Sequence, residues 1–209
     1  QLANLKTAQV TALTSVQVTG IADADIVGFS TAGFNALNSV QIGQLSTAQV
    51  AALATVELAA MGTDDILGLT SDQITGMGVA QLTSLSTAQV SNLSSVQING
   101  LETADIAGLT TAQVSAISSV SLQNLSTAQV AGLVTAQLAN LKTAQIAALT
   151  SVQVTGIETS DISGFTTAGF RSLDSVQIGQ FSTAQVAALT VSEVAAMGTD
   201  DLQGLTTAQ

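Results

Sequence analysis

Residues 45–52 read Leu45-Ser46-Thr47-Ala48-Gln49-Val50-Ala51-Ala52, and variants of this stretch fill the chain. Stepping by eight from Leu5 gives only Leu, Ile, Phe or Met as far as Leu205. A second register, from Leu2 to Leu202, is also apolar throughout. No insertion or deletion interrupts either register. The chain is therefore built from an eight-residue repeat, and we call each unit an octad.

Each octad carries signals for a very short helix. Ser46 as N-cap and Gln49 three residues later form a Ser-x-x-Gln capping box, and Leu45 with Val50 forms a hydrophobic staple around it. Gly, Asn or Ala then occupies the slot of Ala52, where a left-handed C′ residue would end the helix. Because an isolated one-turn helix is unstable in water, each octad must bury its two apolar residues against other octads.

This pattern favours a repeat solenoid of short capped one-turn α-helices, one per octad, wound into an elongated superhelix. A continuous helix fails because eight residues at about 100° each leave a drift of about 80° per repeat. The alternative is a β-solenoid with residues 48–50 as a short strand, which Thr and Val favour but Ala and Gln do not. Ser-Val-Gln variants recur 24 residues apart, as at Ser15 and Ser39, which hints at three octads per superhelical turn.

We expect one continuous octad solenoid over residues 1–209, because the unbroken phase leaves no boundary. A longer period lies above the octad. Residues 137–209 restate residues 1–73, so the chain holds a super-repeat of 136 residues (1–136) and a partial copy (137–209). Its low charge and abundant Ala, Thr, Ser and Gln indicate a thin, regularly spaced core.

Composition excludes several classes of function. The net charge is −11, and the only basic residues are Lys6, Lys142 and Arg171. Nucleic-acid binding and attraction to an anionic membrane surface both need more Lys and Arg than this. The most apolar window, Val50 to Met61, is too short to span a membrane, so no membrane insertion is expected. Cys is absent, which excludes disulfides and thiolate metal sites.

No catalytic, cofactor-binding or metal-binding residue is predicted, and we expect that the chain is not an enzyme. A Ser nucleophile needs a base, and the chain has no His. Its Ser and Thr recur at fixed positions, which marks them as helix caps. A Ca²⁺ site is the alternative to solvated capping for the acidic residues, and capping is favoured because adjacent Asp side chains point apart. The acidic residues concerned are Asp23, Asp25, Asp64, Asp65, Asp72, Asp200 and Asp201.

Two octads stand out because Phe fills both apolar positions and Gly replaces Gln between them. These are the octads of Phe29 and Phe34 around Gly33, and of Phe165 and Phe170 around Gly169. A local adjustment of the core and a contact between molecules both fit this pattern, and we favour the first. Lys6, Lys142 and Arg171 are expected on solvated faces.

The octad resembles the Leu-Thr-Thr-Ala-Gln-Val-Ala-Ala tracts of very long surface or secreted proteins of Gram-negative bacteria. The resemblance extends over the whole chain, as in Leu109-Thr110-Thr111-Ala112-Gln113-Val114. It implies a structural or adhesive role at the cell surface or outside the cell, and it identifies no site residues.

The expected function is a structural scaffold, the protomer or shaft of a filament, sheath or adhesin. The alternative is a binding module whose regular Thr and Ser rows engage a periodic surface such as ice or polysaccharide. Self-association is expected, because an uncapped repeat leaves hydrophobic ends that stacking can cover. The variant octads at residues 28–34 and 62–65 return 136 residues later, which fits either contact points at a fixed spacing or recent duplication.

Overall fold

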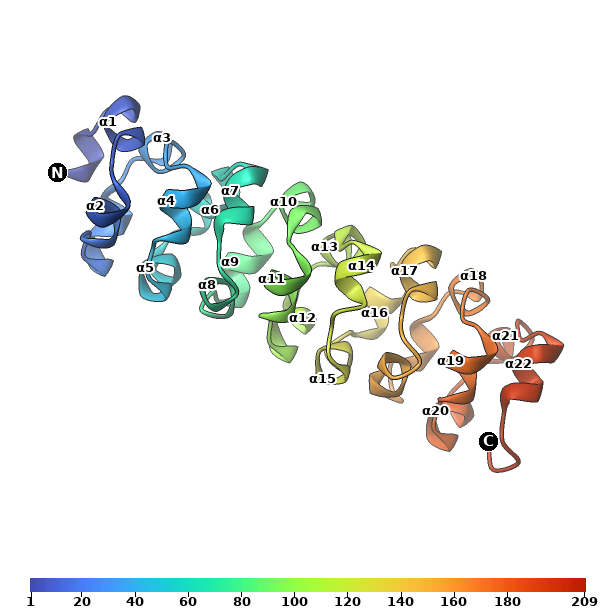
Figure 1. Cartoon of the computed structure of the whole chain (residues 1–209). Helices are drawn as coiled ribbons and strands as arrows, with labels where there is room; N and C mark the ends of the chain where they lie inside the picture. The colour runs from blue at the N-terminus through green and yellow to red at the C-terminus, as the bar shows by residue number, and fades with distance from the viewer. The chain divides into compact units, whose positions relative to one another are not determined.

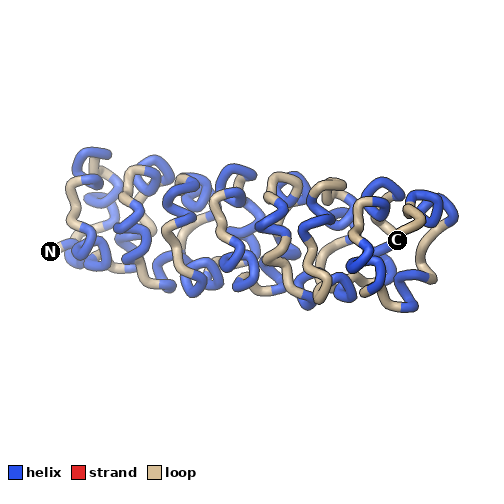
Figure 2. Tube along the Cα trace, turned by 90° about the horizontal axis from the view of Figure 1, so that it is seen from below, coloured by secondary structure: helices blue, strands red, loops and turns tan.

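The computed structural model of the chain describes residues 1–209 and consists of 22 α-helices and four 3-10 helices joined by short loops (Figures 1 and 2). It contains no strand. Successive helices begin eight residues apart, as at Thr47, Thr55 and Thr63. The prediction of a helical repeat solenoid with one short helix per octad is confirmed, and the β-solenoid alternative is wrong.

The chain divides into two compact units, Gln1–Leu101 and Glu102–Gln209. The expectation of one continuous solenoid over residues 1–209 stays a prediction. The helices of the first unit are η1 (Leu2–Asn4), α1 (Thr7–Thr11), α2 (Ser15–Thr19), η2 (Asp23–Gly28), α3 (Thr31–Phe34), α4 (Ser39–Gly43), α5 (Thr47–Ala52), α6 (Thr55–Ala60), α7 (Thr63–Gly68), α8 (Ser71–Thr75), α9 (Val79–Ser84), α10 (Thr87–Asn92) and α11 (Ser95–Asn99).

The helices of the second unit are α12 (Thr103–Gly108), α13 (Thr111–Ala116), α14 (Ser119–Leu122), α15 (Thr127–Val130), α16 (Thr135–Leu138), α17 (Thr143–Ala147), η3 (Gln153–Gly156), η4 (Ile162–Gly164), α18 (Thr167–Phe170), α19 (Ser175–Gly179), α20 (Thr183–Ala187), α21 (Val191–Val194) and α22 (Thr199–Gly204).

Within each unit a helix packs against the helix three octads further along the chain. In the first unit α4 packs against α7 and α6 against α9 (Figure 1). In the second unit α12 packs against α15 and α19 against α22. Three octads therefore make one turn, as the 24-residue spacing of the Ser-Val-Gln variants indicates, and we call each such turn a coil.

The core of each unit consists of the two apolar registers. Every buried hydrophobic side chain belongs to one of them, apart from Ala196. Leu45 and Val50, the two residues of the predicted staple, are 5% and 0% exposed. The core is thin because each octad contributes only two large side chains, as the composition indicates.

The helix starts agree with the sequence. The Ser46 Oγ accepts a hydrogen bond from the backbone N–H of Gln49 at 2.9 Å, and the Gln49 Oε1 accepts one from the backbone N–H of Ser46 at 2.6 Å. The same reciprocal pair forms where Thr70 caps the helix that contains Gln73. The predicted capping box is confirmed.

The helix ends differ from the prediction. No residue, glycine included, has a positive φ, so the expected left-handed C′ residue is wrong. Gly76, for example, has φ −75° and ψ −8°, which any residue adopts. The chain leaves the helix through an extended apolar residue such as Leu53, with φ −62° and ψ 139°. The next coil then receives the chain without a left-handed turn.

Glycine serves close packing between coils instead. A Cβ on Gly68 would lie 2.2 Å from the carbonyl oxygen of Ser39 in the preceding coil. In the second unit a Cβ on Gly132 would lie 2.5 Å from the carbonyl oxygen of Thr103. Both distances are far below van der Waals contact, so these positions require a residue without a side chain.

Replacing Gly78 with Ser is expected to raise the free energy of unfolding by about 0.5–1 kcal/mol. Gly78 is the N-cap of α9, its φ and ψ of −81° and 161° resemble those of Ser46, and no atom lies within 4 Å of its Cβ position. The new hydroxyl can therefore accept from the backbone N–H of Gln81. Urea unfolding followed by far-UV circular dichroism measures the change, and a loss of stability would contradict this account of the cap.

Candidate functional site

The most distinctive polar feature is a buried glutamine that joins successive coils. Gln89 is 2% exposed, and its Oε1 accepts from the backbone N–H of Ser86 at 2.7 Å. Its Nε2 donates to the carbonyl oxygens of Leu58 and Met61 in the preceding coil, both at 2.8 Å. One side chain thus caps its own helix and bonds to the coil before it.

The same arrangement recurs along both units, and we call these residues clamp glutamines. Their Nε2 donates to a carbonyl oxygen 28 residues earlier, and in most of them also to one 31 residues earlier. Those of the first unit are Gln41, Gln49, Gln73, Gln81, Gln89 and Gln97. Those of the second unit are Gln137, Gln145, Gln153, Gln177 and Gln185.

Sequence reasoning identified only half of this role. It predicted the capping function of the glutamine but missed the bonds to the preceding coil. The signal that could have revealed them is the choice of Gln over Glu at a helix N-terminus, where the helix dipole favours an acid. Gln has the amide donor that Glu lacks, and a donor is needed only when an acceptor lies nearby.

Glu193 occupies a clamp position without being able to clamp. It is 1% exposed, and its Oε2 accepts from the backbone N–H of Thr190 at 2.6 Å. Its Oε1 is buried and has no hydrogen-bond partner. A carboxylate cannot donate to the carbonyl oxygens that a clamp glutamine would reach, so this position is under-satisfied.

Replacing Glu193 with Gln is expected to stabilise the protein by about 1–3 kcal/mol. The new Nε2 can donate to the carbonyl oxygens of Ile162 and Phe165, which lie 31 and 28 residues earlier, as those bonded by Gln185 do. Chemical denaturation of the variant measures the gain. The control is Glu158→Gln, an exposed position where the same change should have almost no effect. Equal shifts in both variants would show that lost charge, not the clamp, causes the change.

The acidic residues singled out from the sequence do not converge. Asp65 accepts from the backbone N–H of Gly62 at 3.1 Å and Asp201 from that of Gly198 at 2.8 Å, so both are helix caps as expected. Asp23 accepts from the Ser46 Oγ at 2.9 Å. The other four, Asp25, Asp64, Asp72 and Asp200, are exposed.

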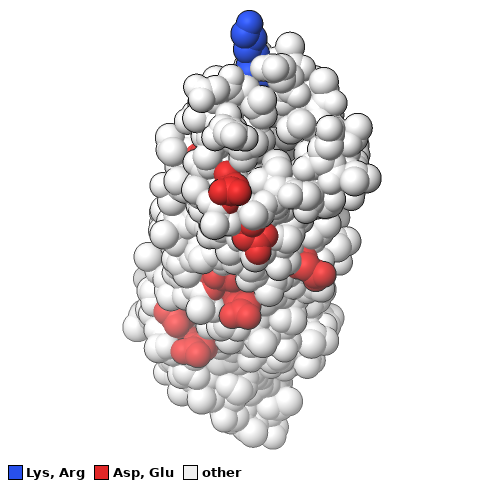
Figure 3. Space-filling model, turned by 90° about the vertical axis from the view of Figure 1, so that its left-hand side faces the viewer, with Lys and Arg blue, Asp and Glu red and all other residues white.

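No group of three or more His, Cys, Asp or Glu residues could hold a metal ion. On the face shown in Figure 3 the acidic side chains lie singly or in small groups among uncharged atoms. The prediction that the chain has no metal or cofactor site stays a prediction.

Asp65 makes stability depend weakly on pH. Burial raises the pKa of its carboxyl above the ordinary value of 3.8, the hydrogen bond from Gly62 opposes this shift, and the neighbouring Asp64 adds to it. A raised pKa means that the folded state favours the protonated form. The contribution is therefore present below the ordinary pKa and is lost as pH rises through the raised one.

The expected result is that wild-type protein loses more stability than Asp65→Asn as pH rises through this window. Asn keeps an oxygen that can accept from Gly62 but does not titrate. Thermal unfolding of both proteins across acidic pH measures the difference, which isolates Asp65 from the other carboxyls. A difference that is independent of pH would contradict the assignment.

The phenylalanine octads belong to the core. Phe34 and Phe170 are fully buried, and Phe29 and Phe165 are 5% exposed. The rings of Phe165 and Phe170 meet edge to face with centroids 6.3 Å apart. These findings support the interpretation as a local core adjustment, and they remove the phenylalanines as contact points between molecules. Lys6, Lys142 and Arg171 are exposed, as expected.

Some hydroxyls outside the caps also bond between coils. The Thr75 Oγ1 donates to the carbonyl oxygen of Gly100 at 2.7 Å, and the Thr103 Oγ1 donates to that of Ala128 at 3.0 Å. Cap and inter-coil bonds both tie hydroxyls to the backbone, and no His lies in the chain to activate one. The expectation that the chain is not an enzyme stays a prediction.

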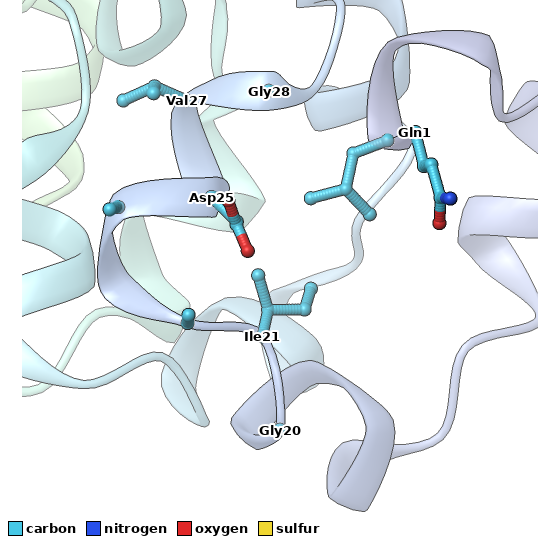
Figure 4. Close-up of a pocket in the computed structure, with 9 residues that line it drawn as sticks. Gln1, Gly20, Ile21, Asp25, Val27 and Gly28 are labelled. Atoms are coloured by element: carbon cyan, nitrogen blue, oxygen red, sulfur yellow. The ribbon is translucent and has the colours of Figure 1, made fainter.

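One cavity lies on the first coil of the first unit (Figure 4). It has a volume of about 530 Å³, and Asp25 and Ile21 point into the space between η2 and the segment of Gln1. Its other lining residues are small or apolar, among them Gly20, Val27 and Gly28. With a single ionisable side chain, the cavity lacks the converging groups that chemistry on a substrate needs.

The fold and the clamps define a class: a helical repeat protein whose polar side chains join one coil to the next. A family model described as the ALTTAQ repeat matches the chain four times in tandem, at residues 20–55, 58–95, 98–135 and 154–191. These matches cover more than half of the chain, which therefore belongs to the ALTTAQ repeat family. A search of curated proteins found no match. None of the helices has the length and apolar character that crossing a bilayer requires.

Proposed function

We propose that this chain is a structural scaffold, the protomer or shaft of a filament, sheath or adhesin at the cell surface or outside the cell. We favour the filament form. The observation that carries the proposal is the clamp, which uses the buried glutamine of octad after octad to join coils. A joint that repeats without change can extend a structure indefinitely, which is what a scaffold needs.

The distribution of polar groups also supports this proposal. The buried polar side chains lie at the clamp positions, and the buried hydroxyl there, on Ser121, likewise occupies such a position. Enzymes and small-molecule sites instead keep a few polar groups free to face a ligand in a concave pocket. Low charge favours assembly, because few charges must be desolvated when surfaces meet.

Electron microscopy and light scattering of the purified chain, from micromolar concentration upward, test the proposal. We expect filaments and a mass that rises with concentration. A particle that stays monomeric at every concentration would contradict the filament form.

Ice-recrystallisation and glycan-array assays test the alternative of a binding module. A scaffold should be silent in both, whereas activity in either would favour binding through the Thr and Ser rows. The bonds that Thr75 and Thr103 donate within their units argue against this alternative, because those hydroxyls already have acceptors.

A further inference from the structure

The first coil of the first unit carries clamp groups without partners. Gln9 and Gln17 are exposed, and their Oε1 atoms accept from the backbone N–H groups of Lys6 and Thr14, both at 2.9 Å. Their helices are therefore capped like those of interior octads. Their Nε2 atoms have no carbonyl acceptor, although every clamp glutamine described above has one. The Asp25 carboxylate beside them makes no hydrogen bond within the chain.

The last coil of the second unit carries the complementary acceptors. The carbonyl oxygens of Leu189 and Met197 occupy octad positions that accept from clamp glutamines elsewhere, and no group of the chain donates to them. The apolar registers are uncovered on this coil, since Val194 is 47% exposed and Leu202 53% exposed. Interior residues of the same register, such as Val50, are fully buried.

We propose that the last coil of one copy docks on the first coil of a second copy through the clamp itself. This inference rests on the proposed filament function and names its contact. Gln9 and Gln17 lie eight residues apart, as Leu189 and Met197 do, so both glutamines donate to these carbonyl oxygens in one register. The uncovered Val194 and Leu202 then become buried against the cavity-bearing coil.

Asp25 fits the same register. Its counterpart in the second unit, Asp161, accepts from the backbone N–H of Thr135 at 2.6 Å and also from its Oγ1. In the docked pair Thr207 stands where Thr135 stands, so Asp25 gains both of these bonds. Gln1 and Gln209 fall on the same octad position, and one of these two terminal residues is displaced. The contact joins unlike faces, so it does not close and yields a filament.

The test uses Gln→Glu substitutions, because Glu keeps the cap and removes only the donor. Glu57 shows this, since its Oε2 accepts from the backbone N–H of Ala54 at 2.8 Å. The variant is Gln9→Glu with Gln17→Glu. The control, Gln44→Glu with Gln123→Glu, adds the same two charges at exposed positions outside the clamp. Thermal unfolding should show that both variants stay as stable as wild type.

Sedimentation velocity over a range of concentrations measures association. We expect wild type and control to associate alike, and the Gln9→Glu/Gln17→Glu variant to associate at least about 100-fold more weakly. The last coil of this variant is intact, so an excess of it should cap wild-type filaments and shorten them. The control should lengthen them as wild type does.

The possible failures separate the two proposals. A wild-type chain that never associates overturns both the filament function and this contact. Association of the Gln9→Glu/Gln17→Glu variant at wild-type strength overturns only the contact and leaves another surface responsible. Equal weakening of variant and control assigns the effect to charge and also overturns the contact.

Discussion

Replacing Gln89 with Ala is expected to lower the free energy of unfolding by about 3–5 kcal/mol. The substitution leaves the backbone N–H of Ser86 and the carbonyl oxygens of Leu58 and Met61 without the partner they have in the native structure. Each buried group left unpaired costs about 1–3 kcal/mol, and the lost side chain leaves a cavity. The expected effect is large because one side chain serves both its own helix and the preceding coil.

Urea unfolding monitored by circular dichroism measures this loss. Gln44→Ala is the matched control, because Gln44 is exposed and makes no clamp bond, and its effect should stay within about 0.5 kcal/mol. A second variant, Gln89→Glu, keeps the cap and removes only the bonds to the preceding coil. Similar stability for Gln89→Glu and wild type would show that those bonds contribute little, which contradicts the clamp.

Replacing Gly68 with Ala is expected to cost about 2–4 kcal/mol. The added Cβ would lie 2.2 Å from the carbonyl oxygen of Ser39 and 2.7 Å from its Cα. These are backbone atoms and cannot rotate away, so the two coils must separate. A smaller unfolded-state entropy returns only about 0.4–1 kcal/mol of this loss.

The control for this prediction is Gly78→Ala in the same unit. Nothing lies within 4 Å of the Cβ position of Gly78, so the change in stability should be close to zero. Differential scanning calorimetry of the two variants gives the comparison. Equal destabilisation would mean that both glycines act through the local backbone, and the account of close coil packing would then be wrong.

Much of the candidate site could be predicted only in part. Sequence reasoning placed Asp65 and Asp201 correctly as caps, because a capping bond joins residues three apart. It identified neither the partnerless Nε2 of Gln9 and Gln17 nor the open face around Asp25. Those features become visible only when the partners of equivalent residues, 26 to 31 positions away, are known.

The sequence by itself determined the octad phase, the two apolar registers and the start of each helix at residues such as Ser46 and Thr70. These depend on interactions within one octad, so local chemistry suffices to specify them. Only the tertiary structure decided that glycine permits close coils and that Gln89 bonds to Leu58 and Met61. The error over a left-handed C′ glycine has the same origin. A glycine satisfies a local turn and a distant backbone equally well, and only the neighbouring coil shows which of the two requires it.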